Sequence, residues 1–247
     1  MLSKYFLNKL FVLKKILFIG LPFAIVSGPL LSDLFISLIG IFFLIYCFFE
    51  KKNFYLFKNI FFILLFFFNL YLIIISLFSK DLYLSLSSSL FYFRFLIFAF
   101  AIRFILIKDA NMAIYFFYSL CLMSFILIID SYYQYFNGAN ILGFEYNGVR
   151  LSSLFGEESI LGSYLSRLMP IIFGLFAFKK IKSKYFLTLT LLILVLSDVI
   201  IFLSGERVAF FMLTLSSILI VLCVRNWFYV RLISILFSFV IILIILF

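Results

Sequence analysis

The sequence contains no histidine, so the commonest general base and metal ligand is missing from the chain. Its three cysteines, Cys47, Cys121 and Cys223, lie far apart inside apolar runs. Cysteines placed in this way are expected to be small buried hydrophobic residues, and they form neither a disulfide framework nor a metal-ligand pattern. We therefore expect no zinc or other transition-metal site and no cofactor.

Charged residues are also scarce. They make up 12% of the 247 residues, whereas 67% are hydrophobic, and the mean hydropathy is +1.32. An average soluble domain is about half apolar and about a quarter charged. A chain of this composition cannot cover its own surface with polar groups, so the sequence predicts an integral membrane protein. No long polar insertion separates the apolar runs, and residues 1–247 are expected to form a single transmembrane domain.

The length accommodates about nine membrane spans, because about 20 apolar residues cross a hydrocarbon core of about 30 Å. We therefore predict an all-α, polytopic helical bundle in which Gly28-Pro29 joins the first two spans as a tight hairpin. Residues 79–89 are predicted to be a short serine-rich loop. The last apolar run has no polar flank, which predicts a C-terminal truncation. The expected spans are 16–31, 33–49, 59–78, 90–107, 112–130, 159–178, 186–203, 208–224 and 232–247.

The formal net charge of +10 would suggest nucleic acid for a soluble protein, but lysine and arginine collect in the cytoplasmic loops of membrane proteins. If the N-terminus is cytoplasmic, the N-terminal segment and the loops at 50–58, 108–111, 179–185 and 225–231 share that side. They hold fourteen lysines and arginines, Arg231 among them, whereas the loops of the other side hold Lys80, Arg150 and Arg207. This asymmetry predicts a cytoplasmic N-terminus and no nucleic-acid partner.

The stretch from Tyr135 to Pro170 differs in composition from the apolar runs around it. Before its apolar part begins, it contains four glycines, which tolerate the left-handed backbone of turns, together with three acids and one basic residue. The predicted topology puts this loop and the turn at 204–207 on the same outer side. We expect the chemistry of the protein here. The charged residues are Glu145, Glu157, Glu158 and Arg150.

Arginine is depleted on the outer side of membrane proteins, so the presence of Arg150, Arg207 and the more deeply placed Arg167 has to be explained. Internal pairing is one: Glu206 or Asp198 with Arg207, and Glu157 or Glu158 with Arg150. Binding of an anionic ligand at the membrane interface is the other, because the planar guanidinium matches phosphate and carboxylate. Glu157 and Glu158 at the start of a span either complement the helix dipole or supply a catalytic base.

Two patches of the sequence share a recognisable pattern. The first has an arginine, a Ser-Leu-Phe-Gly turn, two acids and a Tyr-Leu that opens a helix; the second is a Ser-Gly-x-Arg turn before the next helix. The patches are Gln134-Tyr135-Phe136-Asn137-Gly138 with Arg150-Leu151-Ser152-Ser153-Leu154-Phe155-Gly156-Glu157-Glu158 through Leu165 to Pro170, and Leu203-Ser204-Gly205-Glu206-Arg207-Val208-Ala209. Both patches resemble the O-antigen ligase and polymerase family, and the resemblance covers residues 60–224 in layout.

This resemblance implies a multi-pass glycosyltransferase of the bacterial inner membrane that moves a glycan from undecaprenyl diphosphate. Arg150 and Arg207, with a weaker case for Arg167, would hold the diphosphate, whose charge grows as the glycosidic bond breaks. Catalysis would be metal-independent and inverting. Implied partners are the undecaprenyl-diphosphate-linked oligosaccharide, the bilayer, and a chain-length regulator or flippase. The family's later outer loop, which supplies a histidine in ligases, is missing, so this chain alone would be an incomplete enzyme.

Three alternatives stay open from the sequence. Transfer of the glycan to lipid A core would make the protein a ligase, although the Phe-Gly-Glu-Glu form at 155–158 favours a polymerase. A transporter or flippase for an anionic lipid or solute would be expected to show inverted repeats and charges near the membrane midplane. A non-catalytic membrane scaffold would leave the outer arginines without a role.

Overall fold

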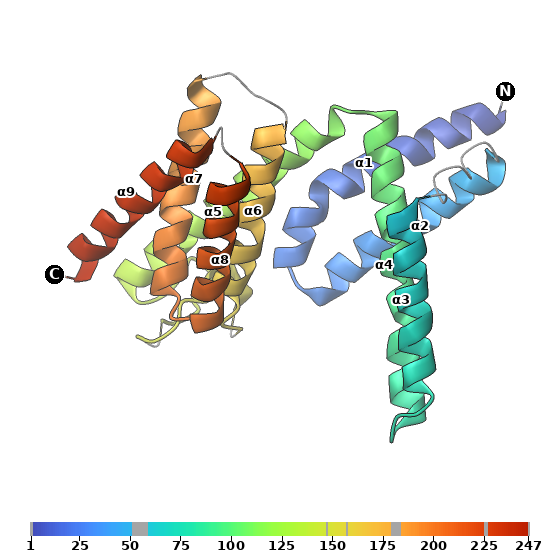
Figure 1. Ribbon diagram of the computed structural model, residues 1–247, viewed down its shortest axis with the longest axis horizontal. Coiled ribbons are helices and arrows are strands. Elements are labelled where there is room, and N and C mark those ends of the chain that lie inside the picture. Colours follow the sequence, from blue (N-terminus) through green and yellow to red (C-terminus); the bar gives the residue numbers. More distant parts are fainter. Residues whose placement is uncertain are drawn as a thin grey trace. The chain divides into compact units, whose positions relative to one another are not determined.

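The computed structural model describes residues 2–50, 59–146, 148–156, 158–178, 184–224 and 227–246. Within these ranges the chain is helical, and its one β feature is an isolated bridge between Ala139 and Glu145. The predicted all-α class is therefore confirmed for the described residues (Figure 1). The α-helices are α1 (Leu2–Val26), α2 (Pro29–Phe49), α3 (Ile60–Ser76), α4 (Leu82–Lys108), α5 (Met112–Asn137), α6 (Leu161–Phe178), α7 (Lys184–Leu203), α8 (Arg207–Cys223) and α9 (Phe228–Leu246).

Four of the described helices are long and apolar enough to cross a membrane: α2, α4, α5 and α9. Their mean hydropathy over 18-residue windows lies between 2.2 and 2.7. Many of their large apolar side chains are exposed, such as Phe48 at 80% and Leu122 at 54%. Apolar helices that leave such side chains uncovered need a lipid environment, so the chain is a membrane-embedded protein.

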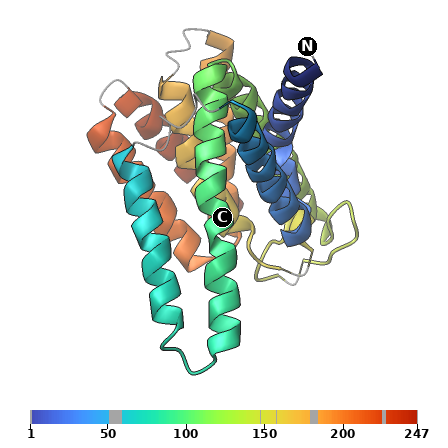
Figure 2. The same ribbon diagram turned by 90° about the vertical axis from the view of Figure 1, so that its right-hand side faces the viewer.

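The chain divides into two compact units, residues 1–113 and 114–247. In the first unit, α1 packs against α2, and α4 packs against both α2 and α3. Gly28 has a φ of 123° and Pro29 is the first residue of α2, so the predicted hairpin between the first two helices is confirmed. Figure 2 shows α3 and α4 as a pair joined by a short turn, near which the Ser76 and Ser89 hydroxyls are 3.0 Å apart.

The serine-rich segment 79–89 was predicted to be a loop, and that prediction is wrong from Leu82 onward, because these residues form the first turns of α4. The helix begins at Leu82, where the side chain of Asp81 accepts the amide of Leu84 and caps it. The serines that follow donate their hydroxyls to carbonyl groups three or four residues earlier, as Ser88 does to Leu84. This local bonding satisfies the hydroxyls inside a helix, which composition alone does not reveal.

Basic residues gather at one end of the first unit. The Lys15 ammonium lies 2.5 Å from a carboxylate oxygen of Asp109, and the Lys108 ammonium donates to the Tyr46 hydroxyl. Lys14 is buried, with its nitrogen 4.5 Å from the ring centroids of both Tyr46 and Phe104. The N-terminal helix and the segment after α4 therefore meet at Lys15 and Asp109.

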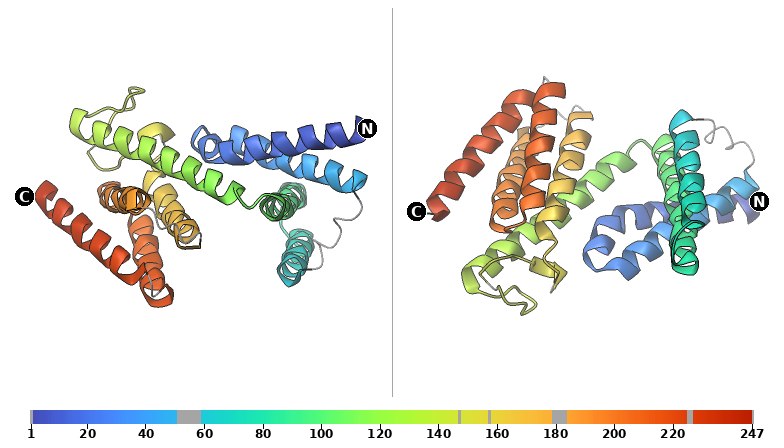
Figure 3. Two further views of the ribbon diagram at one scale, coloured as in Figure 1. Left: turned by 90° about the horizontal axis from the view of Figure 1, so that it is seen from above. Right: turned by 60° about the horizontal axis from the view of Figure 1, so that its bottom comes forward.

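In the second unit, α6 packs against α7 and α8, and α9 packs against α7 and α8. Figure 3 shows α9, in red, along the outside of this group. Asp198 of α7 and Arg231 of α9 form a buried two-pronged ion pair with distances of 2.7 and 3.1 Å. The predicted pairing of Asp198 with Arg207 is therefore wrong. Arg231, assigned to a loop from the sequence, lies inside α9 because Asp198 and nearby serines satisfy its guanidinium.

Candidate functional site

Two side chains near the end of α5 hold the polar loop that follows it. The expected span ended at Asp130, but α5 continues to Asn137, and Asp130 is buried. The Gln134 carbonyl oxygen accepts the amides of Ser152 and Ser153 at 3.1 and 2.8 Å, and its amide group donates to the Phe144 carbonyl. Gln134 thus joins two separate parts of the loop to α5. Asp130 lies four residues earlier and therefore on the same face of the helix.

Ser153 is the most constrained residue of the loop. Its φ of 50° is unusual for a residue with a side chain, and the residue is fully buried. The Ser153 amide donates to Gln134, its hydroxyl donates to Asp130 at 2.6 Å, and its carbonyl accepts the Asn140 side chain at 2.7 Å. A strained backbone kept in place from three directions is typical of a functional segment, since its cost must be offset by its surroundings.

The turn between α7 and α8 is attached to the beginning of α6 through Glu206. The carboxylate of Glu206 accepts the amides of Gly162 and Ser163 at 2.7 and 3.1 Å, and it also accepts the Ser163 hydroxyl. An acid at this place satisfies helix amides that otherwise lack a partner and complements the helix dipole. The predicted pairing of Glu206 with Arg207 is therefore wrong, because its carboxylate is turned toward α6.

Gly162 is required at this contact. A Cβ on Gly162 would lie 2.3 Å from the Ser204 hydroxyl oxygen and 3.0 Å from a carboxylate oxygen of Glu206. The first distance is too short for a carbon atom, and the second would require the Glu206 carboxylate to move. The absence of a side chain at Gly162 thus lets the turn approach the first residues of α6.

The loop and the turn touch each other at Gly205. A Cβ on Gly205 would lie 2.7 Å from the carbonyl oxygen of Val149 and 3.8 Å from Cγ of Arg150, and the φ of Gly205 is 69°. Both the close approach and the left-handed backbone exclude a side chain at this position. Residues 149–150 therefore lie directly against the turn that precedes Arg207.

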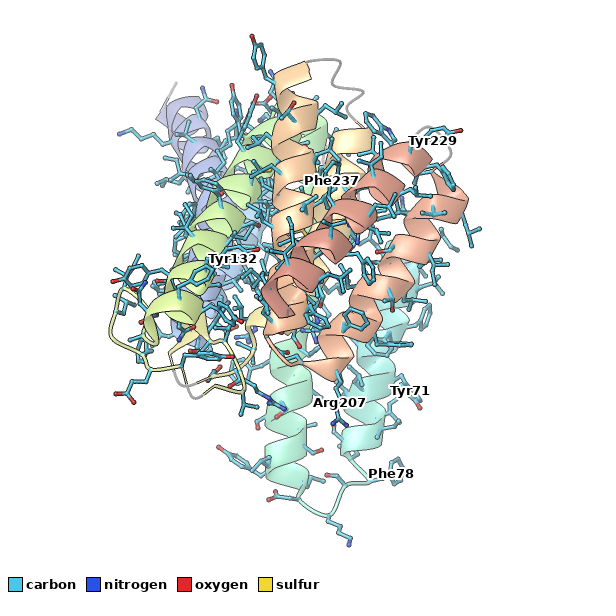
Figure 4. All side chains as sticks on the ribbon, turned by 90° about the vertical axis from the view of Figure 1, so that its left-hand side faces the viewer. Tyr71, Phe78, Tyr132, Arg207, Tyr229 and Phe237 are labelled. Carbon is cyan, nitrogen blue, oxygen red and sulfur yellow. The ribbon has the colours of Figure 1, made fainter. Side chains whose placement is uncertain are left out.

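Arg150 and Arg207 are both exposed at this contact. Arg207, labelled in Figure 4, is the first residue of α8. It has no ion-pair partner among the described residues. The free amides of a helix N-terminus carry a partial positive charge, which adds to that of Arg207. The contact thus has a positively charged, solvent-facing surface, the electrostatic requirement for binding phosphate.

The other predicted site residues are placed less centrally. Arg167 is exposed six residues into α6, and Glu158 is exposed just before that helix. Glu157 lies outside the described residues. The capping role expected of Glu157 or Glu158 at α6 is filled by Glu206, whose carboxylate accepts the first amides of that helix. Arg94 lies in the other unit, where it is paired with Asp33 at 2.9 Å.

Two pairs of aromatic side chains lie in or next to the polar loop. The rings of Tyr135 and Tyr146 are 5.9 Å apart, and those of Phe155 and Tyr164 are 5.2 Å apart in an edge-on arrangement. Partial burial raises the pKa of the Tyr146 hydroxyl, and the neighbouring Tyr135 adds to this shift. Tyr146 is therefore a neutral hydrogen-bonding group near neutral pH. In the described part of the chain, no three His, Cys, Asp or Glu residues come together as metal ligands.

Gln134, Ser153 and Gly162 lie in the first patch quoted for the resemblance, but sequence reasoning did not assign them, Asp130 or Asn140 a part in holding the loop. Asp130 and Gln134 carried a usable signal, since two polar residues four apart near the end of an apolar run share one helix face. Asn140, Ser153 and Gly162 carried no such signal, because their roles depend on contacts between segments far apart in the chain.

Comparisons with protein-family models, with curated proteins and with solved structures found no match to this chain.

Proposed function

We propose that this protein is a multi-pass glycosyltransferase of the bacterial inner membrane that takes a glycan from undecaprenyl diphosphate and extends a surface polysaccharide. The observation that carries this proposal is the contact of residues 149–150 with Gly205, which brings two exposed arginines to one end of the second unit. The resemblance of the loop and the turn to the O-antigen polymerase and ligase family supplies the substrate class.

The chemistry assigned to the arginines follows from the leaving group. When the acceptor hydroxyl attacks the anomeric carbon from the opposite face, the bond from that carbon to the diphosphate oxygen breaks. The electron pair remains on the diphosphate, whose negative charge increases. Arg150 and Arg207 would stabilise this charge by hydrogen bonds that strengthen in the transition state. Inversion at the anomeric carbon follows from the single displacement.

The acidic residues divide between two roles in this proposal. Glu206 is engaged by the amides of Gly162 and Ser163, so we assign it to holding the turn that carries Arg207. Glu158 is exposed before α6 and is assigned, with Glu157, as the group that accepts the proton of the attacking hydroxyl. Arg167 is a further candidate for the diphosphate, one and a half turns along α6.

The orientation is part of the same proposal. About nine helices cross the membrane, and the N-terminus is cytoplasmic. The loop at 138–160 and the turn at 204–206 then face the periplasm, where the carrier-linked glycan is used. Lysines on the opposite side support this orientation, as does the contact between Lys15 and Asp109. We favour a polymerase over a ligase because of the Phe155-Gly156-Glu157-Glu158 form.

The proposal is tested by profiling carrier-linked glycans in a deletion strain complemented with the full-length gene. Arg150→Ala or Arg207→Ala should cause single repeat units to accumulate on the carrier, with normal amounts of protein in the membrane. The matched control is Lys80→Ala, which removes an exposed cation from the same predicted side but from the first unit.

A change in the products separates the remaining alternatives. Loss of glycan from lipid A core with unaltered chain lengths would identify a ligase. Unchanged chain-length distributions in both arginine variants would contradict the proposed site and favour transport of an anionic lipid or solute.

A further inference from the structure

The polar loop after α5 contains a small hairpin with an apolar tip. The bridge between Ala139 and Glu145 joins its two sides, and Asn140 and Gly143 close the turn between them. Ile141 and Leu142 occupy this turn and are 67% and 63% exposed. A turn that faces water usually carries Gly, Asn, Asp or Ser at such positions, so two exposed aliphatic residues there are unusual.

The tip is held rigidly. The amide of Ile141 donates to a carboxylate oxygen of Asp130 at 3.1 Å, and the amide of Leu142 donates to the side chain of Asn140 at 3.0 Å. Asn140 is itself buried and bonded to the Ser153 carbonyl. The two aliphatic side chains are therefore presented outward by a fixed backbone and cannot turn inward to cover themselves.

The bond to Asp130 also sets the level of the tip along α5. Asp130 lies seven residues before Asn137, the end of the helix, which corresponds to a rise of about 10 Å. The hairpin thus folds back beside the last two turns of α5. The exposed side chains of Tyr133 and Phe136 lie on those same turns.

The length of α5 relates this level to the membrane. Its 26 residues correspond to about 39 Å, whereas the hydrocarbon core is about 30 Å thick. A helix that begins at one edge of the core reaches the other edge near Asp130, and the remaining residues extend into the headgroup region. The tip at the level of Asp130 is then beside the boundary between headgroups and hydrocarbon.

We propose that the hairpin tip, Ile141 with Leu142, inserts shallowly into the lipid interface at the end of α5. The partner is the bilayer itself, since α5 is one of the helices long and apolar enough to span it and the tip folds back along that helix. Insertion covers the exposed aliphatic and aromatic side chains and leaves Glu145 on the watery side. The inference is independent of any enzymatic activity.

The test uses a fluorophore attached to a single cysteine. Cys223 is exposed and is replaced by serine, whereas Cys47 and Cys121 are buried and stay. Leu142→Cys is labelled and reconstituted in nanodiscs whose lipids carry bromine near the headgroup end of the acyl chain. Glu145→Cys is the control on the polar side of the hairpin, and Leu122→Cys on the exposed face of α5 is the control within the span.

The expected result is that the shallow brominated lipid quenches the label at 142 at least about twofold more than the label at 145, while aqueous iodide shows the reverse order. Ile141→Cys should repeat the pattern. A label at 142 that iodide quenches as well as it quenches the label at 145 would place the tip in water and overturn the inference. Protection from both quenchers would mean that protein covers the tip, which also overturns it.

Discussion

Asp198 of α7 and Arg231 of α9 face each other, with Arg231 Nη1 donating to Oδ2 of Asp198 and Nη2 donating to Oδ1. The two side chains are 5% and 3% exposed. Ser217 and Ser234 accept the remaining hydrogens of the guanidinium, so every charged group of the pair has a partner. The pair joins three helices of the second unit, and it is unrelated to the cationic surface at Arg207.

This pairing predicts a strong asymmetry between single and double substitution. Asp198→Asn or Arg231→Met should lower the free energy of unfolding by about 3–5 kcal/mol, because each leaves a buried charge without its partner. The double variant Asp198→Leu with Arg231→Met should be closer to the wild type. Unfolding by SDS in mixed micelles measures these differences. A single variant as stable as the wild type would contradict the pairing.

A second prediction concerns Gly162. Gly162→Ala should lower the free energy of unfolding by about 1–3 kcal/mol, because its methyl group would overlap the hydroxyl oxygen of Ser204 and press on Glu206. Gly174, in the same helix, has no atom within 4 Å of the place where a Cβ would be built. Gly174→Ala is therefore the matched control, and it should leave stability unchanged or raise it by up to about 1 kcal/mol. Equal effects of the two substitutions would exclude the close contact.

A third prediction concerns Gln134. Gln134→Ala would leave the buried amides of Ser152 and Ser153 without an acceptor, at a cost of about 1–3 kcal/mol. Amide hydrogen exchange at these two residues should then be faster by about ten- to hundredfold. Gln134→Glu keeps an acceptor and should recover part of the protection.

The control for this measurement is Asn137→Ala. Asn137 lies on the same helix, is exposed, and bonds locally to the Tyr133 carbonyl. Asn137→Ala should leave amide hydrogen exchange at Ser152 and Ser153 unchanged. If Gln134→Ala also leaves it unchanged, the loop does not depend on α5 for its conformation.

Much of the fold was predictable because its signal is local. Runs of Phe, Leu and Ile identify apolar helices, and Gly28-Pro29 identifies a hairpin, since each depends on neighbouring residues. The position of the polar loop followed in the same way from its glycines. The start of α4 was missed because serines are compatible with both loops and helices, and the choice depends on hydroxyl bonds such as that of Ser88 to Leu84.

The contacts of the site were less predictable because they join distant residues. Asp198 was assigned to Arg207, nine residues away, but its partner is 33 residues away in α9. Glu206 was assigned to the arginine beside it, but it bonds to Gly162 and Ser163. Proximity in sequence is a poor guide to pairing in a helical bundle, because helix packing decides which charged residues meet.

The most direct measurement of the central claim is binding of undecaprenyl diphosphate to the purified protein in nanodiscs. Arg150→Ala and Arg207→Ala should each weaken binding by about tenfold or more, because each removes charge-assisted hydrogen bonds to the diphosphate. Lys80→Ala should bind like the wild type, and unfolding midpoints should show that all three variants are folded. Wild-type affinity in both arginine variants would contradict the claim that this surface holds the carrier diphosphate.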